Sequence, residues 1–275
     1  MDRDKRVSIA GDWNTKPRVL AKLASDEDAD VRCEVAYNPS TPPKALEQLS
    51  QDIDWHVQYC VAENISVPPT ILTELASSER WKVREAVARS TSAPPEAQQI
   101  LLMDKVTNVR EAVASNPSTP PVVLSQLARD ESEYVRREVA ANPFAPSDVL
   151  EKLAEDQDVL VRYCIARFNP NTPPEVLAYL AYDEYNGVRF GVARHQNTPP
   201  STLAELAYDE DIGIRYAVAI EPSTPPEALA RLATDGERQV REVAERNPST
   251  PPILRMSGLP AVVPVLPQPP TMEIN

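Results

Sequence analysis

The segment NPSTPPKALEQL, residues 38–49, decides the fold, because nearly the same letters return three more times along the chain. The later copies are NPSTPPVVLSQL from Asn116, NPNTPPEVLAYL from Asn169 and EPSTPPEALARL from Glu221. A segment that recurs in this way is a structural unit, and internal repeats set the architecture before any site is considered. The sequence therefore predicts an array of similar units.

A second motif, Val-Arg or its equivalent, gives the interval between units. It begins at Val31 and returns at positions 57, 83, 109, 135, 161, 188, 214 and 240. The steps are 26 residues, apart from one of 27 at which Phe168 is an inserted residue. Nine units are visible, with half of a preceding unit before them. We expect a solenoid domain over residues 1–252 and a proline-rich tail over residues 253–275.

The first part of each unit is expected to form a short helix. A threonine such as Thr41 precedes two prolines. Proline is tolerated at the start of a helix because amides in the first turn have no helical partner, so we expect the prolines to begin the helix and the threonine hydroxyl to cap it. Leucines three residues apart, such as Leu46 and Leu49, follow. This spacing fits a 3₁₀ turn as well as an α turn.

The second part of each unit is expected to form another helix. It opens at an aspartate such as Asp26, places Val31 and Val35 four residues apart on one face, and ends where Asn-Pro prevents continuation. Neither helix is long enough to persist alone in water, so each must bury its apolar stripe on neighbouring repeats. The fold class predicted is an all-α solenoid of about nine two-helix repeats.

Composition limits the classes of function. The formal net charge is −13, which disfavours a partner held through phosphates, because that binding depends on Lys and Arg. No apolar run approaches the length of a membrane span, and residues 1–12 contain no apolar export signal. We therefore expect a cytoplasmic protein with no membrane partner.

The cysteines indicate reduced thiols. Cys33, Cys60 and Cys164 are far apart, odd in number and without a Cys-x-x-Cys motif. This pattern fits neither a disulfide framework nor a clustered metal site. No cofactor is expected, and a redox role for these thiols is the weakest functional hypothesis.

The repeat unit resembles the variant leucine-rich repeat, a bacterial family with the form NPSTPPxxLxxLAxDxxxxVRxxVAxNP. The resemblance covers about nine tenths of the chain and implies alternating α and 3₁₀ helices stacked in a right-handed superhelix. It implies no general biochemical activity. Some relatives carry an iron–sulfur segment before the repeats, but nothing before Cys33 matches it. The second helix is also similar to that of HEAT repeats, in which an Asp and an Arg form a ladder along the solenoid.

Charged residues recur in register with the repeat. An arginine follows each repeat valine except at Gln58, and an aspartate usually lies six residues before it. One hypothesis is a basic stripe for nucleic acid; the other, which we favour, is a structural ladder, because a guanidinium fork binds carboxylates within or between repeats. The ladder residues predicted are Asp26, Arg32, Asp104, Arg110, Asp130, Arg136, Asp156, Arg162, Asp183, Arg189, Asp209, Arg215, Asp235 and Arg241.

Aromatic residues are concentrated between residues 163 and 216. Tyr163, Phe190 and Tyr216 directly follow the repeat arginine in three successive units, where other units carry Glu or Arg. Because this position tolerates charge, we expect it to be exposed and to anchor a protein partner; the alternative is that these rings fill gaps between repeats. The predicted partner-binding residues are Tyr163, Tyr182, Tyr185, Phe190, Tyr208 and Tyr216.

The sequence contains no recognisable catalytic constellation. The two histidines, His56 and His195, lie in separate repeats, and His195 replaces the Asn of an Asn-Pro turn. Paired carboxylates recur at helix starts, where they complement the helix dipole. The leading hypothesis is a non-enzymatic scaffold with an extended acidic surface for another protein or peptide. The alternative, from another class, is a nucleic-acid-binding solenoid that uses the arginine column.

Overall fold

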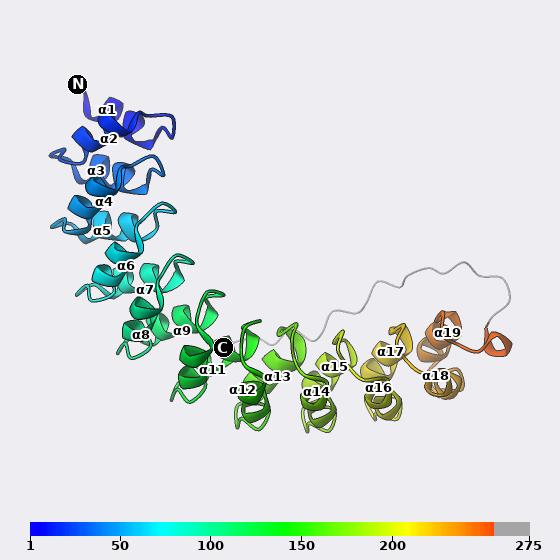
Figure 1. Ribbon diagram of the computed structural model, residues 1–275. Helices are drawn as coiled ribbons and strands as arrows, with labels where there is room; N and C mark the ends of the chain where they lie inside the picture. Colours follow the sequence, from blue (N-terminus) through cyan, green and yellow to red (C-terminus); the bar gives the residue numbers. More distant parts are fainter. Residues whose placement is uncertain (256–275) are drawn as a thin grey trace. The chain divides into compact units, whose positions relative to one another are not determined.

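The computed structural model describes residues 1–255, and within that range the chain forms nineteen α-helices and no strand (Figure 1). The chain divides into two compact units, Met1–Pro146 and Ser147–Asn275. In each unit longer and shorter helices alternate. The proposed boundary of the tail, after residue 252, falls at the edge of the described residues, and most of the tail lies outside them.

In the first unit the longer helices are α1 (Arg3–Gly11), α3 (Ala29–Tyr37), α5 (Trp55–Ala62), α7 (Trp81–Arg89), α9 (Thr107–Ser115) and α11 (Glu133–Ala141). The shorter helices are α2 (Pro17–Leu23), α4 (Pro43–Ser50), α6 (Pro69–Leu75), α8 (Pro95–Leu101) and α10 (Pro121–Leu127). Each shorter helix follows a longer one, so a pair of helices makes one repeat.

In the second unit the longer helices are α13 (Val159–Arg167), α15 (Asn186–Ala193), α17 (Ile212–Ile220) and α19 (Arg238–Arg246). The shorter helices are α12 (Ser147–Leu153), α14 (Pro174–Leu180), α16 (Pro200–Leu206) and α18 (Pro226–Leu232). A 3₁₀ turn, η1 (Pro252–Leu254), follows α19.

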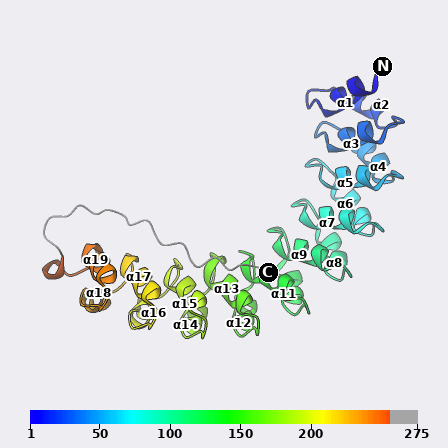
Figure 2. The same ribbon diagram turned by 180° about the vertical axis from the view of Figure 1, so that it is seen from behind.

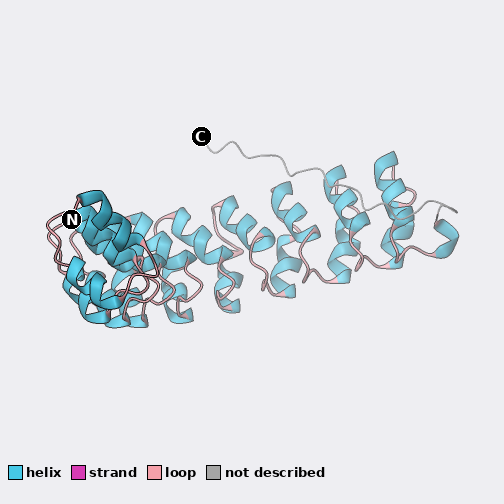
Figure 3. Cartoon of the chain, turned by 90° about the horizontal axis from the view of Figure 1, so that it is seen from above, coloured by secondary structure: helices cyan, strands magenta, loops and turns pink. Residues whose placement is uncertain are grey.

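The helices of each unit stack in two rows. Each longer helix packs against the next longer one, as α3 does on α5 and α15 on α17. Shorter helices pack on each other in the same way, as α6 does on α8. The view from behind in Figure 2 shows the same alternation, and Figure 3 shows that only loops join the helices. The predicted two-helix repeat is confirmed.

The core of each repeat comes from the apolar residues that define it. Val31 and Val35 of α3 are fully buried, and Leu46 and Leu49 of α4 are at most 1% exposed. Because each helix buries one stripe, its stability comes from contact with neighbouring repeats rather than from its own length.

The two prolines start the shorter helices, but the predicted role of the threonine is wrong. In α4 the N-cap residue is Pro42, and Pro43 is the first helical residue. The hydroxyl of Thr41 instead donates to the backbone oxygen of Val35, at 2.5 Å, in the last turn of α3. Thr41 lies too early in the turn to reach amides of α4, whereas carbonyls at the end of α3 lack helical partners. The threonine therefore closes the preceding helix.

Two further details differ from expectation. Asp26 does not open α3; it accepts the amide of Asp28 at 3.1 Å in the preceding turn, and Asp28 is the N-cap. The shorter helices are α-helical, and among residues 1–255 only η1 is 3₁₀. Leucines three residues apart are compatible with both geometries, which is why the sequence left this open. No helix in the described part of the chain is long and apolar enough to span a membrane.

Candidate interaction surface

Arginines and aspartates, one of each in most repeats, form a column of ion pairs, here called the Asp–Arg ladder. Arg110 of α9 donates from Nε to Oδ2 of Asp130 at 2.7 Å and from Nη2 to Oδ1 at 2.8 Å. Its Nη1 donates to the backbone oxygen of Asp104 at 2.8 Å. Each arginine thus binds the carboxylate of the next repeat and the backbone of its own. The same carboxylate pairs join Arg6 to Asp26, Arg32 to Asp52, Arg84 to Asp104, Arg162 to Asp183, Arg189 to Asp209 and Arg215 to Asp235.

The ladder is largely removed from solvent. The side chains of Arg110 and Asp130 are 9% and 8% exposed. Burial alone would raise the pKa of Asp130, but hydrogen bonds from Arg110 and from the Ser132 amide stabilise the charged carboxylate and lower its pKa overall. The paired arginines therefore do not present a basic stripe to a ligand.

One rung of the ladder is neutral. Gln58 stands in the arginine position, and its Nε2 donates to the backbone oxygen of Asp52 at 2.8 Å. Its Oε1 accepts the hydroxyl of Ser78 at 3.2 Å, and Ser78 occupies the aspartate position of the next repeat. Both members of the rung have changed together, so no charge is left unpaired. Arg136 and Arg241 likewise donate from Nη1 to the backbone oxygens of Asp130 and Asp235.

A second column, of asparagines, links the repeats and was missed in the sequence. Asn116 is 3% exposed, and its Nδ2 donates to the backbone oxygens of Ala88 at 2.7 Å and Ser90 at 2.9 Å in the preceding repeat. Its Oδ1 accepts the amide of Ser118. The same contacts to the preceding repeat are made by Asn38, Asn64, Asn142 and Asn247. The signal was present, because Asn64 keeps the position although no proline follows it.

His195 occupies the asparagine position of its repeat. Its Nε2 lies 2.7 Å from the backbone oxygen of Asn169, and its Nδ1 accepts the amide of Asn197 at 3.1 Å. These two contacts require a neutral imidazole with its proton on Nε2. Burial lowers the pKa of His195, which agrees with that form. The histidine is a structural substitute for asparagine.

The three aromatic residues that directly follow the repeat arginine are not freely exposed. Tyr163, Phe190 and Tyr216 lie on α13, α15 and α17, and each is half-buried. The ring of Tyr163 packs edge-on against Phe168 with centroids 5.6 Å apart. The expectation that this position is exposed is wrong. Charge at this position does not require exposure, because a charged residue there can pair within its own helix, as Glu85 does with Lys82 and Arg89.

The exposed members of the predicted set lie instead just after the shorter helices. Tyr182 and Tyr208, which follow α14 and α16, are 73% and 70% exposed, and Tyr179 of α14 is 57% exposed. Tyr185, the N-cap residue of α15, is half-buried. Of the six predicted residues, the three on the longer helices and Tyr185 are therefore half-buried, and only Tyr182 and Tyr208 are exposed.

Two cavities lie beside the exposed tyrosines, both within the second unit. One, of about 510 Å³, is lined by Tyr182, Tyr208 and Glu205 among others. The other, of about 570 Å³, is lined by Tyr179, Tyr182 and Glu155. Both share Tyr182, Asp183 and Glu184, so the cavities adjoin. We call this pair the tyrosine cavities.

Carboxylates dominate the tyrosine cavities. Together their walls contain seven carboxylates and two arginines. Arg162 and Arg189 are already bound to Asp183 and Asp209. The side chain of Glu184 is 91% exposed and makes a longer contact, 3.7 Å, to Nη2 of Arg162. Tyr182 donates its hydroxyl to Oε2 of Glu205 at 2.8 Å, and this bond raises the pKa of Tyr182. The surface combines exposed aromatic rings with excess negative charge.

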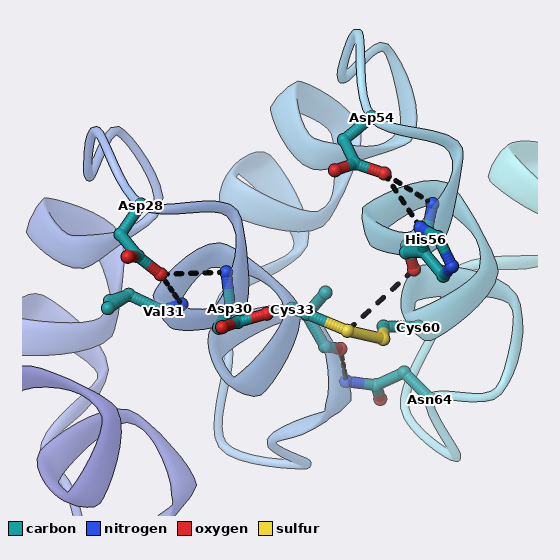
Figure 4. The surroundings of a disulfide bond; sticks show 9 residues. Asp28, Asp30, Val31, Cys33, Asp54, His56, Cys60 and Asn64 are labelled. Carbon is teal, nitrogen blue, oxygen red and sulfur yellow. Dashed lines mark hydrogen bonds and ion pairs between the residues drawn. A yellow bond between two sulfur atoms is a disulfide. The ribbon is translucent and has the colours of Figure 1, made fainter. Parts of the chain in front are cut away.

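A disulfide joins two repeats in the first unit. Cys33 of α3 and Cys60 of α5 are bonded, with Cα atoms 5.6 Å apart (Figure 4). The expectation of reduced thiols is wrong for this pair. Their separation of 27 residues is close to one repeat, so the stacking of α3 on α5 places them side by side. Cys164 is not part of this bond.

No metal centre is apparent in the described part of the chain. Residues 1–255 contain no group of three or more His, Cys, Asp or Glu side chains arranged to hold a metal ion. His56, the second histidine, is bound through Nδ1 to Asp54 at 3.0 Å, and its amide donates to the same oxygen (Figure 4). This contact is a local helix cap.

The chain is similar to known repeat proteins. The model of the family described as leucine rich repeat variant matches residues 29–54, 107–132 and 187–211. A solved structure described as a leucine-rich repeat variant with a novel repetitive structural motif is 26% identical, covers 77% of this chain and 84% of that chain, and gives a TM-score of 0.58. These findings confirm the resemblance and the repeat fold.

Other solved structures are more distant. An engineered protein is 20% identical, with 89% of this chain and 93% of that chain covered and a TM-score of 0.41. A protein of Escherichia coli is 14% identical, with 89% and 95% covered and a TM-score of 0.43. No curated protein matches the chain significantly.

Proposed function

We propose that this array of leucine-rich repeat variants is a non-enzymatic scaffold that binds another protein or a peptide. Repeat solenoids commonly present extended surfaces to partners, since each unit adds to one continuous face. The proposal places the contact at the tyrosine cavities of the second unit. A partner of this kind would use an acidic surface with aromatic anchors.

One observation carries this assignment. Tyr182 and Tyr208 expose most of their side chains to solvent at the edge of a cavity. Large exposed aromatic groups that gather in one place are typical of protein interfaces, where they supply most of the binding energy. The half-buried row of Tyr163, Phe190 and Tyr216 is better suited to packing between helices than to first contact with a partner.

The experiment is capture of partners from a lysate of the native host. The wild-type protein is compared with the double variant Tyr182→Glu, Tyr208→Glu, and captured proteins are identified by mass spectrometry. Tyr37→Glu is the matched control, because Tyr37 is 51% exposed but lies on α3 in the first unit. We expect a specific protein that is lost with the double variant and kept with the control. Capture that is the same for all three proteins would contradict the proposed contact.

Nucleic-acid binding has less support. The arginines that would contact phosphates are bound to carboxylates at low exposure, as Arg189 is to Asp209. Binding through phosphates also requires affinity that falls steeply with salt concentration. Absence of DNA and RNA binding at low ionic strength would remove this alternative.

A cytoplasmic location remains part of the proposal. The Cys33–Cys60 disulfide is the observation against it, because such bonds persist mainly in oxidising compartments. Trapping thiols in intact cells with an alkylating reagent tests the location. A Cys33–Cys60 pair that is alkylated in cells agrees with the cytoplasm, and a pair that is protected argues for an oxidising compartment.

A further inference from the structure

The second unit already holds one arginine on a tyrosine. The guanidinium of Arg231, on α18, lies 4.1 Å from the ring centroid of Tyr208. Its Nη1 donates to the backbone oxygen of Ala207 at 2.5 Å and lies 3.7 Å from Oδ2 of Asp235. A cation over a tyrosine ring, a carbonyl acceptor and a nearby carboxylate together form a site for a guanidinium.

One repeat earlier the same site is built without its arginine. Tyr182 stands in the position of Tyr208, Ala181 in that of Ala207, and Asp209 in that of Asp235. All three residues line the first of the tyrosine cavities. The position of Arg231 is taken by Glu205, which binds the hydroxyl of Tyr182 at its edge. Tyr182 is 73% exposed, much as Tyr208 is 70% exposed with Arg231 on its ring.

The charge around this site favours a cation. Glu205 and Glu210 contribute further negative charge to the cavity; the side chain of Glu210 is 92% exposed and lies 3.8 Å from Nη2 of Arg189, which is already bound to Asp209. The adjoining cavity is acidic as well, with Glu155 and Glu184 in its wall, but there Glu155 stands in the position of Tyr182 and Tyr179 in that of Arg231. Neither an anion nor an apolar segment matches such walls, because each would leave the carboxylates uncompensated.

We propose that the tyrosine cavities bind arginine side chains of an extended segment of the partner protein, with a guanidinium on Tyr182 in the place that Arg231 takes on Tyr208. This inference rests on the proposed scaffold function and names the chemistry of the partner. Arginine fits better than lysine, because a planar guanidinium both stacks on a ring and donates to carbonyl and carboxylate oxygens.

The repeat spacing sets the spacing of the arginines. Helices packed side by side lie about 8–10 Å apart, so the two adjoining cavities are separated by about that distance. An extended polyproline-type segment rises about 3.1 Å per residue with three residues per turn. Arginines at every third residue would therefore lie on one side of the segment and reach both cavities.

The test is fluorescence anisotropy with a labelled peptide that carries arginine at every third residue in a proline and alanine background. Matched peptides carry lysine, citrulline or glutamate at the same positions, since citrulline keeps the shape of arginine without its charge. We expect the arginine peptide to bind at least about tenfold more tightly than the citrulline peptide, as expected for a charge-assisted contact. We expect no binding of the glutamate peptide.

Variants locate the peptide. Tyr182→Ala should lower the affinity for the arginine peptide about fivefold, because the cation–π contact is lost. Tyr182→Phe should bind as well as wild type, since the ring remains and Glu205 is released. The controls are Tyr37→Ala, at an exposed tyrosine of the first unit, and Glu175→Gln, at an exposed carboxylate of α14. Both should leave binding unchanged, and circular dichroism checks that each variant is folded.

Several results would overturn the inference. They are equal binding of the arginine and citrulline peptides, unchanged binding by Tyr182→Ala, or no binding of the arginine peptide to the wild-type protein. Capture of a host protein that still depends on Tyr182 and Tyr208 would then show that the scaffold function stands and that only the chemistry of the partner is wrong.

Discussion

Arg110 and Asp130 lie twenty residues apart in the sequence, and two hydrogen bonds join the guanidinium of one to the carboxylate of the other across a repeat boundary. The aspartate six residues before Arg110, Asp104, accepts only through its backbone oxygen from this arginine. Each rung therefore forms only when the next repeat is in place. The ladder adds an electrostatic contribution to the apolar contacts between repeats.

Replacing Arg110 tests the ladder. Arg110→Ala leaves the buried carboxylate of Asp130 without its main partner, so we expect the free energy of unfolding to fall by about 3 kcal/mol. Urea denaturation followed by circular dichroism measures the change. Arg129→Ala removes an exposed arginine from the same repeat and should change stability by less than about 0.5 kcal/mol. Equal losses in the two variants would show that the rung contributes nothing specific.

The repeat architecture could be predicted from the sequence because the interval, the prolines and the paired leucines recur together. Their spacing decides which residues face a neighbouring repeat, and burial of Leu46 and Val31 follows from it. Hydrogen bonds in the turns were harder to predict. Thr41 and Asn116 each have several backbone partners within reach, and only the path of the turn decides which one they contact.

The candidate site was only partly predictable. The sequence located the aromatic cluster but not which rings are exposed, because Phe190 and Tyr182 belong to elements that differ in how closely they pack. The disulfide was missed for a different reason: chain separation was considered without the repeat register. Cys60 lies 27 residues after Cys33, one residue more than the repeat length, so the two cysteines occupy neighbouring positions on successive helices. The stacking of these helices brings the two side chains together.

Stability should depend on pH through His195. Because burial lowers its pKa in the folded protein, the unfolded chain takes up a proton more readily than the folded chain as pH falls below about 6.5. The contribution of His195 is therefore complete above that pH and is lost progressively as pH falls through the lowered folded-state pKa. Melting temperatures between about pH 7.5 and pH 5.5 measure this loss.

The variant His195→Asn restores the residue of the asparagine column and removes the titrating group. It should melt with a weaker pH dependence than wild type over the same range. If the melting temperature of His195→Asn depends on pH as strongly as that of the wild type, other groups cause the loss of stability at low pH.

Gln98 is a polar residue at a leucine position of the core. It is fully buried, its Oε1 has no hydrogen-bond partner among the described residues, and its Nε2 contacts are long, at 3.3 and 3.5 Å. The equivalent residues Leu72 and Leu124 are fully buried. Gln98→Leu should therefore raise the free energy of unfolding by about 1–2 kcal/mol.

Thermal and urea denaturation measure this gain. Gln99→Leu is the matched control, because it makes the same change at an exposed neighbour and should have little effect. A loss of stability in Gln98→Leu would indicate that an ordered water satisfies the amide in the folded protein.

The disulfide should stabilise the first unit. The bonded cysteines are 27 residues apart, and the chain-entropy relation gives a stabilisation of about 3.5 kcal/mol for a closed loop of this length. A reductant should lower the melting temperature of the wild type and leave the double variant Cys33→Ser, Cys60→Ser unchanged. Alkylation followed by mass spectrometry should leave both cysteines unlabelled until the reductant is added. Labelling of both without reductant would contradict the bond.

Each paired arginine binds the aspartate of the following repeat, and this arrangement allows repeats to be removed or added without breaking the remaining pairs. Excision of residues 107–132 removes Arg110 and Asp130 together, so the protein loses one complete rung and keeps Arg84 with Asp104. A deletion whose length is not a whole repeat would change the twenty-residue interval between the arginine and the aspartate on either side of the junction, and that rung would be lost. Whole repeats are thus the natural increments by which such a chain is shortened or extended.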